Sequence, residues 1–255
     1  MGKKLVIFNL KMNPSSLREA RKLADFTQNY AEKFGGKAEI VIAPPFVYIP
    51  ALKIINRKLK IGAQNAFWAN EGAYTGEISP EMLKGLGVEY VIIGHSERRK
   101  YLCETDEMIN EKVSTALKAG LKVILCVGEQ KRELRSKNYE LRKAQNYVRD
   151  QLQKDLKGVL NLKSYFLNLI IAYEPVWAIG TGKACKPEDA LEMARFIKKI
   201  LDSRFSILDS RVLYGGSVNG NNVVDFIKYK DIDGVLVGGA SLKPKEVLEI
   251  IKKAG

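Results

Sequence analysis

Residues 90–99 read Tyr-Val-Ile-Ile-Gly-His-Ser-Glu-Arg-Arg, a short apolar run that ends at a glycine and is followed by polar residues. A short, nearly continuous apolar run is typical of a strand buried on both faces. His95 is the only histidine among 255 residues, and it lies where this predicted strand ends. An isolated histidine is more often a hydrogen-bonded structural residue than a catalyst, so a catalytic role needs support from the rest of the chain.

The same pattern, a short apolar run followed by a helical segment, recurs along the whole chain. Apolar residues at helical spacing occur between the runs at 17–33, 107–119, 187–201 and 244–251. Regular alternation of this kind predicts an α/β fold with parallel strands buried on both faces. The eight predicted strands are 5–10, 39–43, 60–63, 90–93, 122–127, 169–173, 211–214 and 234–237.

Eight such units close most naturally into a (β/α)₈ barrel, and the chain has a suitable length for one. The length would also suit two average domains, but no Pro-, Gly- and Ser-rich linker, low-complexity tract or repeat divides the chain. We therefore expect one domain over residues 1–255, with an outer ring of helices. The alternative, a doubly wound open sheet, would usually carry a glycine-rich turn after its first strand, where this chain has Asn-Leu-Lys-Met-Asn-Pro at 9–14.

The composition favours a reducing compartment, and we expect the cytoplasm. Cys103, Cys126 and Cys185 are odd in number and far apart, which disfavours both a disulfide framework and a metal site. The apolar stretch near the start is short, follows two lysines and lacks a cleavage-like end, so it is interpreted as a strand. No run is long enough to predict a membrane-spanning helix.

The formal net charge of +13 favours acidic partners or phosphorylated ligands through long-range attraction. Much of the excess lies between residues 131 and 163, where basic residues alternate with acidic and apolar ones. No aromatic platform accompanies them, so we interpret the segment as the solvated face of a long helix and do not expect nucleic-acid binding. The basic residues are Lys131, Arg132, Arg135, Lys137, Arg142, Lys143 and Arg149.

Polar residues gather where predicted strands end. Side chains alternate along a strand, so Asn9 and Lys11 are expected to point the same way, into the mouth of the barrel. A lysine there is costly unless an anion meets it, although a lysine at a strand end can also extend its ammonium group into solvent.

Glu174 directly follows the sixth predicted strand and precedes a segment, 175–183, that is too apolar for an idle surface loop. Gly180 and Gly182 permit unusual backbone angles, and Pro175 stiffens the near end. This composition suits a small lid that excludes water.

Paired glycines end the last two predicted strands, at 215–216 and 238–239. Bare backbone N–H groups at such turns, followed by helix N-termini, can bind phosphate without a charged side chain. Either pair alone could simply turn the chain, but the last two units are where barrels of this kind commonly bind phosphate.

With these segments in hand, the chain resembles the triosephosphate isomerase family along essentially its whole length. The resemblance implies a barrel that interconverts dihydroxyacetone phosphate and D-glyceraldehyde 3-phosphate in glycolysis and gluconeogenesis. It implies a small phosphorylated triose as substrate, and neither a metal nor an organic cofactor. The matching segments are 9–13, 62–65, 72–77, 94–99, 174–183, 214–218 and 236–241.

The family's established roles fall on particular residues of this chain. Glu174 would move the proton between neighbouring substrate carbons, and neutral His95 would polarise the carbonyl and shuttle hydroxyl protons. Lys11 would stabilise the enediolate and, with Asn9, orient the substrate. Glu97 would lie behind the reacting groups, near Lys11.

The resemblance also implies a phosphate site and a lid. Backbone groups near Gly180, Ser217, Gly238 and Gly239 would hold the phosphate. Leu236 would press on the base from the side opposite the lid. Because an ordinary glutamate is a weak base at neutral pH, expulsion of water by an apolar lid should strengthen it. The lid would comprise Pro175, Val176, Trp177, Ala178, Ile179, Gly180, Thr181, Gly182 and Lys183.

A homodimer is a further implication of the resemblance. Thr75, within the loop 72–77, would reach the neighbouring subunit near Asn9, Lys11 and Glu97. An ordinary polar loop with little mutual burial is the alternative interpretation.

The chain departs from the family pattern at three places. Leu10 stands for a common tryptophan, Leu102-Cys103 for a common Phe-Gly, and Cys185-Lys186 for a small residue followed by Ser or Thr. None of these removes a reacting group. Lys186 is expected to forfeit a helix N-cap hydroxyl at the far hinge of the lid, and Cys103 is expected to be a small buried thiol.

Two other functions are compatible with the fold. A different phosphate-binding barrel enzyme could share the glycine turns, but would not be expected to combine His95, Glu174 and the lid. A non-catalytic phosphate-binding or interaction protein could keep the barrel, because fold alone does not establish function.

Overall fold

The computed structural model describes residues 3–36, 38–53, 59–130, 137–159, 167–207 and 209–255. Parallel strands pair in chain order and close into a barrel, because the first strand also pairs with the last. The strands are β1 (Leu5–Asn9), β2 (Glu39–Ala43), β3 (Lys60–Ala63), β4 (Tyr90–Ile93), β5 (Lys122–Val127), β6 (Leu169–Tyr173), β7 (Arg211–Tyr214) and β8 (Gly234–Val237). The predicted fold class is confirmed, and the open sheet is excluded.

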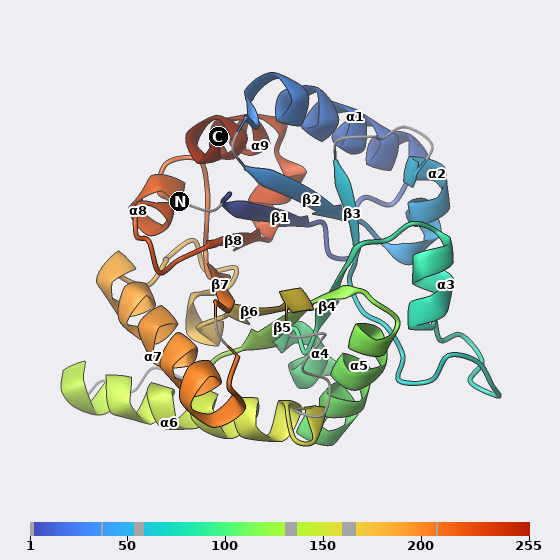
Figure 1. Ribbon diagram of the computed structural model, residues 1–255. Helices are drawn as coiled ribbons and strands as arrows, with labels where there is room; N and C mark the ends of the chain where they lie inside the picture. The colour runs from blue at the N-terminus through green and yellow to red at the C-terminus, as the bar shows by residue number, and fades with distance from the viewer. Residues whose placement is uncertain (1–2, 37, 54–58, 131–136, 160–166, 208) are drawn as a thin grey trace.

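Helices surround the barrel and cover its outer surface (Figure 1). Side-chain oxygens of Ser16 and Thr105 accept backbone N–H bonds at the starts of the first and fifth helices, as N-caps should. The α-helices are α1 (Leu17–Phe34), α2 (Ile49–Lys53), α3 (Pro80–Gly85), α4 (Ser96–Tyr101), α5 (Asp106–Lys118), α6 (Lys137–Asp155), α7 (Pro187–Phe205), α8 (Val223–Ile227) and α9 (Pro244–Ala254). Short 3₁₀ helices are η1 (Phe46–Tyr48), η3 (Val176–Ala178) and η4 (Gly239–Leu242).

The predicted elements agree closely with those observed, with differences at the ends. The first strand stops at Asn9 instead of residue 10, because Lys11 adopts a left-handed backbone conformation with φ of 53°. The predicted helix 187–201 continues to Phe205, where Ser206 closes it in the same left-handed region.

Strand alternation divides the apolar residues into two cores. One lies between the strands and the helices, and the other fills the barrel itself. Side chains two residues apart along a strand share a face. The residue two positions beyond the last interior residue of a strand is therefore expected in the mouth at the carboxyl ends. The interior set is Leu5, Ile7, Val41, Ala43, Tyr90, Ile92, Ile124, Cys126, Ile170, Ala172, Leu213 and Leu236.

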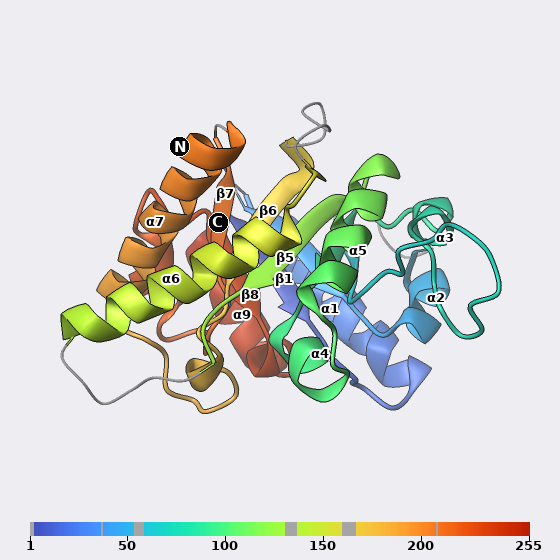
Figure 2. The same ribbon diagram turned by 90° about the horizontal axis from the view of Figure 1, so that it is seen from below.

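One further step along this alternation leads from the interior set to the carboxyl ends of the strands. The step from Ile7 leads to Asn9, and the step from Ala172 leads to Glu174. On β5, β7 and β8 it leads to Gly128, Gly215 and Gly238, which have no side chains to close the mouth. In Figure 2 these ends face downward, with α4 at the lower edge and the amino terminus at the upper edge.

The amino ends of the strands carry charges that pair across the barrel. The Tyr90 hydroxyl donates to Glu39 Oε1 at 2.5 Å, and Arg211 Nη1 donates to Glu39 Oε2 at 3.3 Å. Lys122 Nζ lies 3.5 Å from Glu39 Oε1. Burial alone would raise the pKa of Glu39, but the Tyr90 hydrogen bond and the two cations bring it below its ordinary value.

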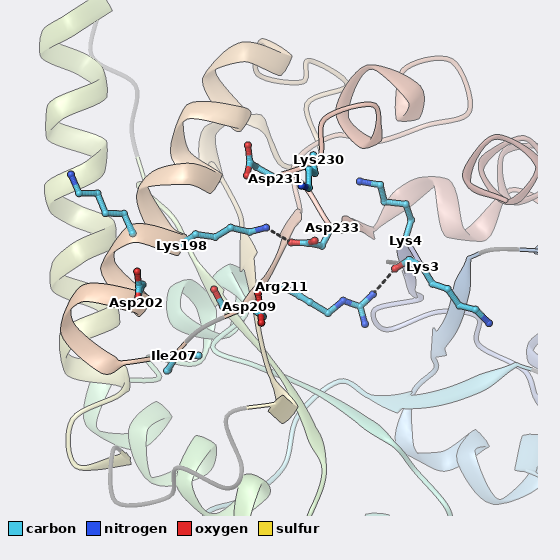
Figure 3. A pocket seen from close by; sticks show the side chains of 12 residues that line it. Lys3, Lys4, Lys198, Asp202, Ile207, Asp209, Arg211, Lys230, Asp231 and Asp233 are labelled. Atoms are coloured by element: carbon cyan, nitrogen blue, oxygen red, sulfur yellow. Dashed lines mark hydrogen bonds and ion pairs between the residues drawn. The ribbon is translucent and has the colours of Figure 1, made fainter. Parts of the chain in front are cut away.

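A hollow of about 780 Å³ opens at this end, beside α7 (Figure 3). Its charges are mixed: Lys198 Nζ lies 2.8 Å from Asp233 Oδ2, and Arg211 Nη2 donates to the Lys3 carbonyl oxygen at 3.1 Å. The hollow therefore lies at the amino ends of the strands. The predicted site residues gather at the opposite end of the barrel, at the carboxyl ends.

Replacement of Glu39 by glutamine should lower the free energy of unfolding by about 1–2 kcal/mol at pH 7, because it removes a charged hydrogen-bond acceptor. Since the pKa of Glu39 is lowered on folding, its contribution is present above the unfolded value near 4.5 and is lost as the pH falls through the folded value. Urea unfolding at pH 7 and pH 3 measures the difference between wild type and Glu39→Gln.

The difference should shrink at pH 3. Glu71→Gln, at an exposed carboxylate, provides the control and should change little at either pH. An equal difference in the free energy of unfolding at both pH values would contradict a stabilising role for the Glu39 charge.

Candidate active site

Glu174 lies at the centre of the mouth, directly after β6, with a residue exposure of only 2%. Its backbone N–H donates to the Val127 carbonyl oxygen at 2.8 Å, which continues the pairing of β5 with β6. Both neighbouring positions require glycine. A Cβ at Gly128 would lie 1.8 Å from the Glu174 carbonyl oxygen, and one at Gly215 would lie 2.9 Å from Glu174 Cγ.

His95 faces this carboxylate and caps the start of α4. Its Nδ1 accepts the backbone N–H of Glu97 at 3.2 Å. A nitrogen that accepts a hydrogen bond carries no proton, so the ring is neutral and its proton is on Nε2. Nε2 lies 3.2 Å from Glu174 Oε1, while the Ser96 N–H donates to Glu174 Oε2 at 3.1 Å. Both carboxylate oxygens therefore have a donor.

Lys11 reaches the mouth through a turn, and its ammonium group forms an ion pair with Glu97. The left-handed backbone is held from two sides: Gln64 Nε2 donates to the Lys11 carbonyl oxygen at 2.7 Å, and Asn9 Oδ1 accepts the Lys11 N–H at 3.0 Å. A Cβ at Gly238 would lie 3.1 Å from Lys11 Cε, so the lysine stem runs along this glycine.

The segment 175–183 has an anchored half and an exposed half. Trp177 Nε1 donates to Glu129 Oε1 at 2.6 Å, and buried Ala178 accepts a hydrogen bond from Ser217 Oγ at 2.6 Å through its carbonyl oxygen. Beyond Ile179 the chain is exposed, and Gly180 and Gly182 both have φ near 70°. The predicted glycine flexibility thus lies in the half with few contacts to the barrel.

Predicted phosphate-binding residues lie around the same mouth. Ser217 contacts Ala178, which belongs to the anchored half of segment 175–183 and lies two residues before Gly180. Gly238 lies against Lys11, and exposed Gly239 begins the short helix η4. The structure thus places these residues beside the carboxyl ends of β6, β7, β8 and β1.

The chain just beyond the predicted lid is held by a tyrosine. Tyr214 OH accepts the Cys185 N–H at 3.1 Å, and the space for this hydroxyl exists because position 216 is glycine: a Cβ there would lie 2.2 Å from it. Lys186 is the N-cap residue of α7 and makes no side-chain capping bond, as expected.

The expectation for Cys103 is wrong. Its side chain is exposed, and its φ of 54° shows a left-handed turn just after Leu102 closes α4. This turn directs the thiol away from the core.

Thr75 lies apart from the other predicted site residues. It is exposed in the connection between β3 and α3, which extends away from the barrel in both views (Figure 1, Figure 2). Within the chain as described, Thr75 forms no hydrogen bond with Asn9, Lys11 or Glu97.

Four residues at the site were not predicted to act there. Gln64 and Glu129 are polar residues just after β3 and β5, and the strand-end pattern could have identified them. Ser96 contributes only its backbone N–H. Cys126 lies inside the barrel, where burial and the Glu174 carboxylate raise the pKa of its thiol.

The basic segment can be followed only in part. Arg142 and Lys143 on α6 are exposed, in agreement with a solvated face. Lys131, Arg132 and Arg135, and the side chain of Lys137, lie outside the described residues. No helix in the described ranges is long and apolar enough to cross a membrane.

A carboxylate, a neutral imidazole and an ammonium group thus meet in one mouth. A cavity of about 190 Å³ adjoins Glu174 on the side of Arg99 and Gln151. This set can transfer a proton, donate a hydrogen bond to an oxygen and stabilise negative charge on it. It suits a reaction that proceeds through proton transfer next to a carbonyl group.

Comparison with known proteins finds similarity to one family of enzymes along nearly the whole chain. The family model described as triosephosphate isomerase matches residues 4–254. A triosephosphate isomerase of Dictyoglomus thermophilum is 45% identical over 99% of this chain and 100% of its own length. The triosephosphate isomerase of Alkaliphilus oremlandii is 42% identical over 98% of this chain and 99% of its own length. That of Caldanaerobacter subterraneus is 47% identical over 84% of this chain and 86% of its own length.

Replacement of Lys186 by threonine should supply the missing N-cap, raise the free energy of unfolding by about 1 kcal/mol and change the rate at which the lid moves. NMR relaxation dispersion at 180–183 measures the lid, and urea unfolding measures stability.

Lys243 offers a matched control, because it also caps a helix without a side-chain bond and also precedes a proline. Lys243→Thr should give a similar gain in stability with no change in the lid. Identical lid rates in wild type and Lys186→Thr would contradict a role for Lys186 in the hinge.

Proposed function

Because the chain belongs to the triosephosphate isomerase family and is an isomerase, we propose that it interconverts dihydroxyacetone phosphate and D-glyceraldehyde 3-phosphate through an enediolate, in glycolysis and gluconeogenesis. The observation that carries the proposal is the contact of buried Glu174 with the neutral ring of His95, at 3.2 Å. The proposed reaction moves only protons, so it requires neither a metal nor an organic cofactor.

Glu174 is the base in this proposal. It removes a proton from the carbon next to the carbonyl group and returns it to the neighbouring carbon. Its burial supports the role, because a carboxylate held in one place and shielded from water can meet the substrate carbon directly. The Ser96 N–H and His95 hold it in the mouth between turnovers.

His95 polarises the substrate carbonyl and moves protons between its oxygens. Since Nδ1 accepts the Glu97 N–H, the Nε2 proton is the one presented to the mouth. A neutral donor of this kind can give a proton to an enediolate oxygen and take it back.

Lys11 supplies the positive charge that the enediolate needs, and Asn9 helps to orient the substrate. Glu97 is paired with Lys11 and so keeps the ammonium group in the mouth before substrate binds. Because Gly238 has no side chain, Lys11 can lie against it, close to the phosphate end of the substrate.

The phosphate group is bound by backbone groups near Gly180, Ser217, Gly238 and Gly239. The lid, 175–183, folds over it and excludes water, and phosphate binding remote from the reacting carbon supplies free energy for that closure. The net charge of +13 favours the approach of such an anion.

A homodimer is part of the proposal. Met12, Val47, Tyr74, Tyr101 and Leu102 are large apolar side chains exposed to solvent. They follow β1, β2, β3 and β4, which are consecutive neighbours in the barrel, so the segments after four adjacent strands expose apolar groups. A second copy of this chain would cover them, with Thr75 reaching its Asn9, Lys11 and Glu97.

We place the protein in the cytoplasm, because the proposed pathway operates there. Cys103, Cys126 and Cys185 form no disulfide with one another, which is expected in a reducing compartment.

The isomerase assay tests the proposed mechanism. Wild type should interconvert the two triose phosphates, while Glu174→Asp and His95→Gln should each lower kcat by about 10²–10⁴-fold, because each removes a placed proton-transfer group. Equal folded concentrations are established by circular dichroism.

A folded, dimeric wild type without this activity would contradict the proposal and would leave another substrate, or binding alone, as the function of the barrel. Loss of activity in neither variant would contradict the assigned roles.

Sedimentation velocity tests the dimer. Thr75→Arg should shift micromolar protein toward monomer, because it would bury a charge in the partner's mouth. Val224→Arg, at an exposed apolar residue of α8, is the control and should leave the dimer intact. A fully active wild-type monomer at micromolar concentration would contradict the assembly.

A further inference from the structure

The inner face of α6 carries two buried polar side chains, Gln151 and Asp155. They are four residues apart and so lie on the same side of the helix, and their residue exposures are 7% and 0%. Buried polar groups destabilise a fold unless they are hydrogen-bonded, so their partners indicate what the helix holds in place. The partner of Gln151 is a backbone N–H beside Glu174, and the partner of Asp155 is the side chain of Arg99, which binds the backbone beside His95.

Gln151 binds the chain beside Glu174. Its Oε1 accepts the Gly128 N–H at 2.8 Å. Gly128 touches the Glu174 backbone so closely that no Cβ would fit between them. On either side of this contact, Val127 and Glu129 accept the backbone N–H groups of Glu174 and Val176. A shift of Gly128 would therefore move Glu174.

Asp155 acts on the other side, through Arg99. Its Oδ2 accepts a hydrogen bond from Arg99 Nη2 at 2.6 Å. The same guanidinium donates to the carbonyl oxygens of Gly94 at 2.9 Å and Cys126 at 3.3 Å, which joins the ends of β4 and β5. Gly94 immediately precedes His95 and has a φ of 73°, so Arg99 holds the turn that aims the imidazole.

Burial is the main reason why Asp155 holds a proton more readily than an ordinary aspartate. Burial, together with the negative charge of Asp106 from α5, raises the pKa of Asp155 to about 7 against the opposing effect of Arg99 from α4. Lys154 of α6 lies 3.3 Å from Asp106 Oδ2, and the Cys126 thiol of β5 lies inside the barrel, within electrostatic range of Arg99 and Asp155. Among the described residues Asp155 Oδ1 has no hydrogen-bond partner, so Oδ2 alone makes the contact with Arg99.

We propose that Gln151 and Asp155 are positioning residues through which α6 sets the placement of Glu174 and His95. Gln151 does so through Gly128, and Asp155 does so through Arg99 and Gly94. The kinetic part of this inference rests on the proposed function, but the structural part does not. Both side chains act through the backbone, and within the described ranges neither forms a hydrogen bond with the side chain of Glu174 or His95.

Four variants separate positioning from stability. Asp155→Leu removes the acceptor for Arg99, whereas Asp155→Asn keeps an acceptor oxygen and places an N–H where the protonated carboxyl has its O–H. Leu152→Ala, at a fully buried neighbour on α6, is the matched control that destabilises the helix packing without touching either contact. Gln151→Leu tests the second contact independently.

In the isomerase assay, Asp155→Leu and Gln151→Leu should lower kcat about tenfold or more with KM changed less than about twofold, because a small displacement of reacting groups slows chemistry more than binding. Asp155→Asn should restore kcat close to wild type. Leu152→Ala should lower the unfolding temperature but keep the kcat of the folded protein.

The single histidine provides a readout that does not need activity. In protein labelled with ¹⁵N-histidine, every imidazole signal comes from His95. Asp155→Leu should shift these signals, while Leu152→Ala and Asp155→Asn should leave them near the wild-type positions. Should Asp155→Leu not fold, Asp155→Ser replaces it, since its short side chain cannot reach Arg99.

Folded Asp155 variants with unchanged His95 signals, or with kcat changes no larger than those of Leu152→Ala, would overturn the role of Asp155. The same kinetic result for Gln151→Leu would overturn that of Gln151. A wild type that does not isomerise triose phosphates, while its His95 signals still respond to Asp155→Leu, would instead reject the proposed function and support the positioning contact.

Discussion

Closure of the sheet, through the pairing of β1 with β8, is the constraint on which the other features depend. A closed parallel barrel has no free edge, and its strands are buried on both faces. Alternation then assigns each residue to the interior or to the helix layer. Above the apolar interior, the same alternation places Glu174 and Asn9 in a ring with Gly128, Gly215 and Gly238, where missing side chains leave room for a ligand.

This arrangement makes the site dependent on backbone placement. Glycine at 94, 128, 215 and 216 allows contacts with Arg99, Glu174 or Tyr214 that a Cβ would crowd or block. Close approach of the backbone lets single N–H groups, such as that of Ser96, bind the Glu174 carboxylate. It also means that groups outside the mouth can affect it: Gln64 holds the Lys11 turn, and Gln151 and Asp155 reach the ends of β4 and β5 from the helix layer.

The two ends of the barrel differ in how their charges are used. At the amino ends, Glu39 gathers Tyr90, Lys122 and Arg211 in contacts that neutralise charge and fasten strands together. At the carboxyl ends, Lys11 and Glu97 form a pair beside a carboxylate and a neutral histidine. The Glu39 contacts join side chains of four strands, whereas the Lys11 pair joins two segments that follow strand ends.

The sequence by itself determined the order and extent of the eight strands, because short apolar runs that alternate with amphipathic helices are typical of parallel strands buried on both faces. It also indicated His95, Glu174 and Lys11, since polar residues after buried strands stand out, and it predicted the missing cap at Lys186. Only the tertiary structure decided that Cys103 is exposed, that Lys11 turns through a left-handed conformation, and that Arg99 links α6 to the histidine turn. The Lys11 turn and the Arg99 link depend on contacts between segments far apart in the chain, and the exposure of Cys103 depends on a left-handed turn. Local periodicity shows neither which distant side chains meet nor where such a turn occurs.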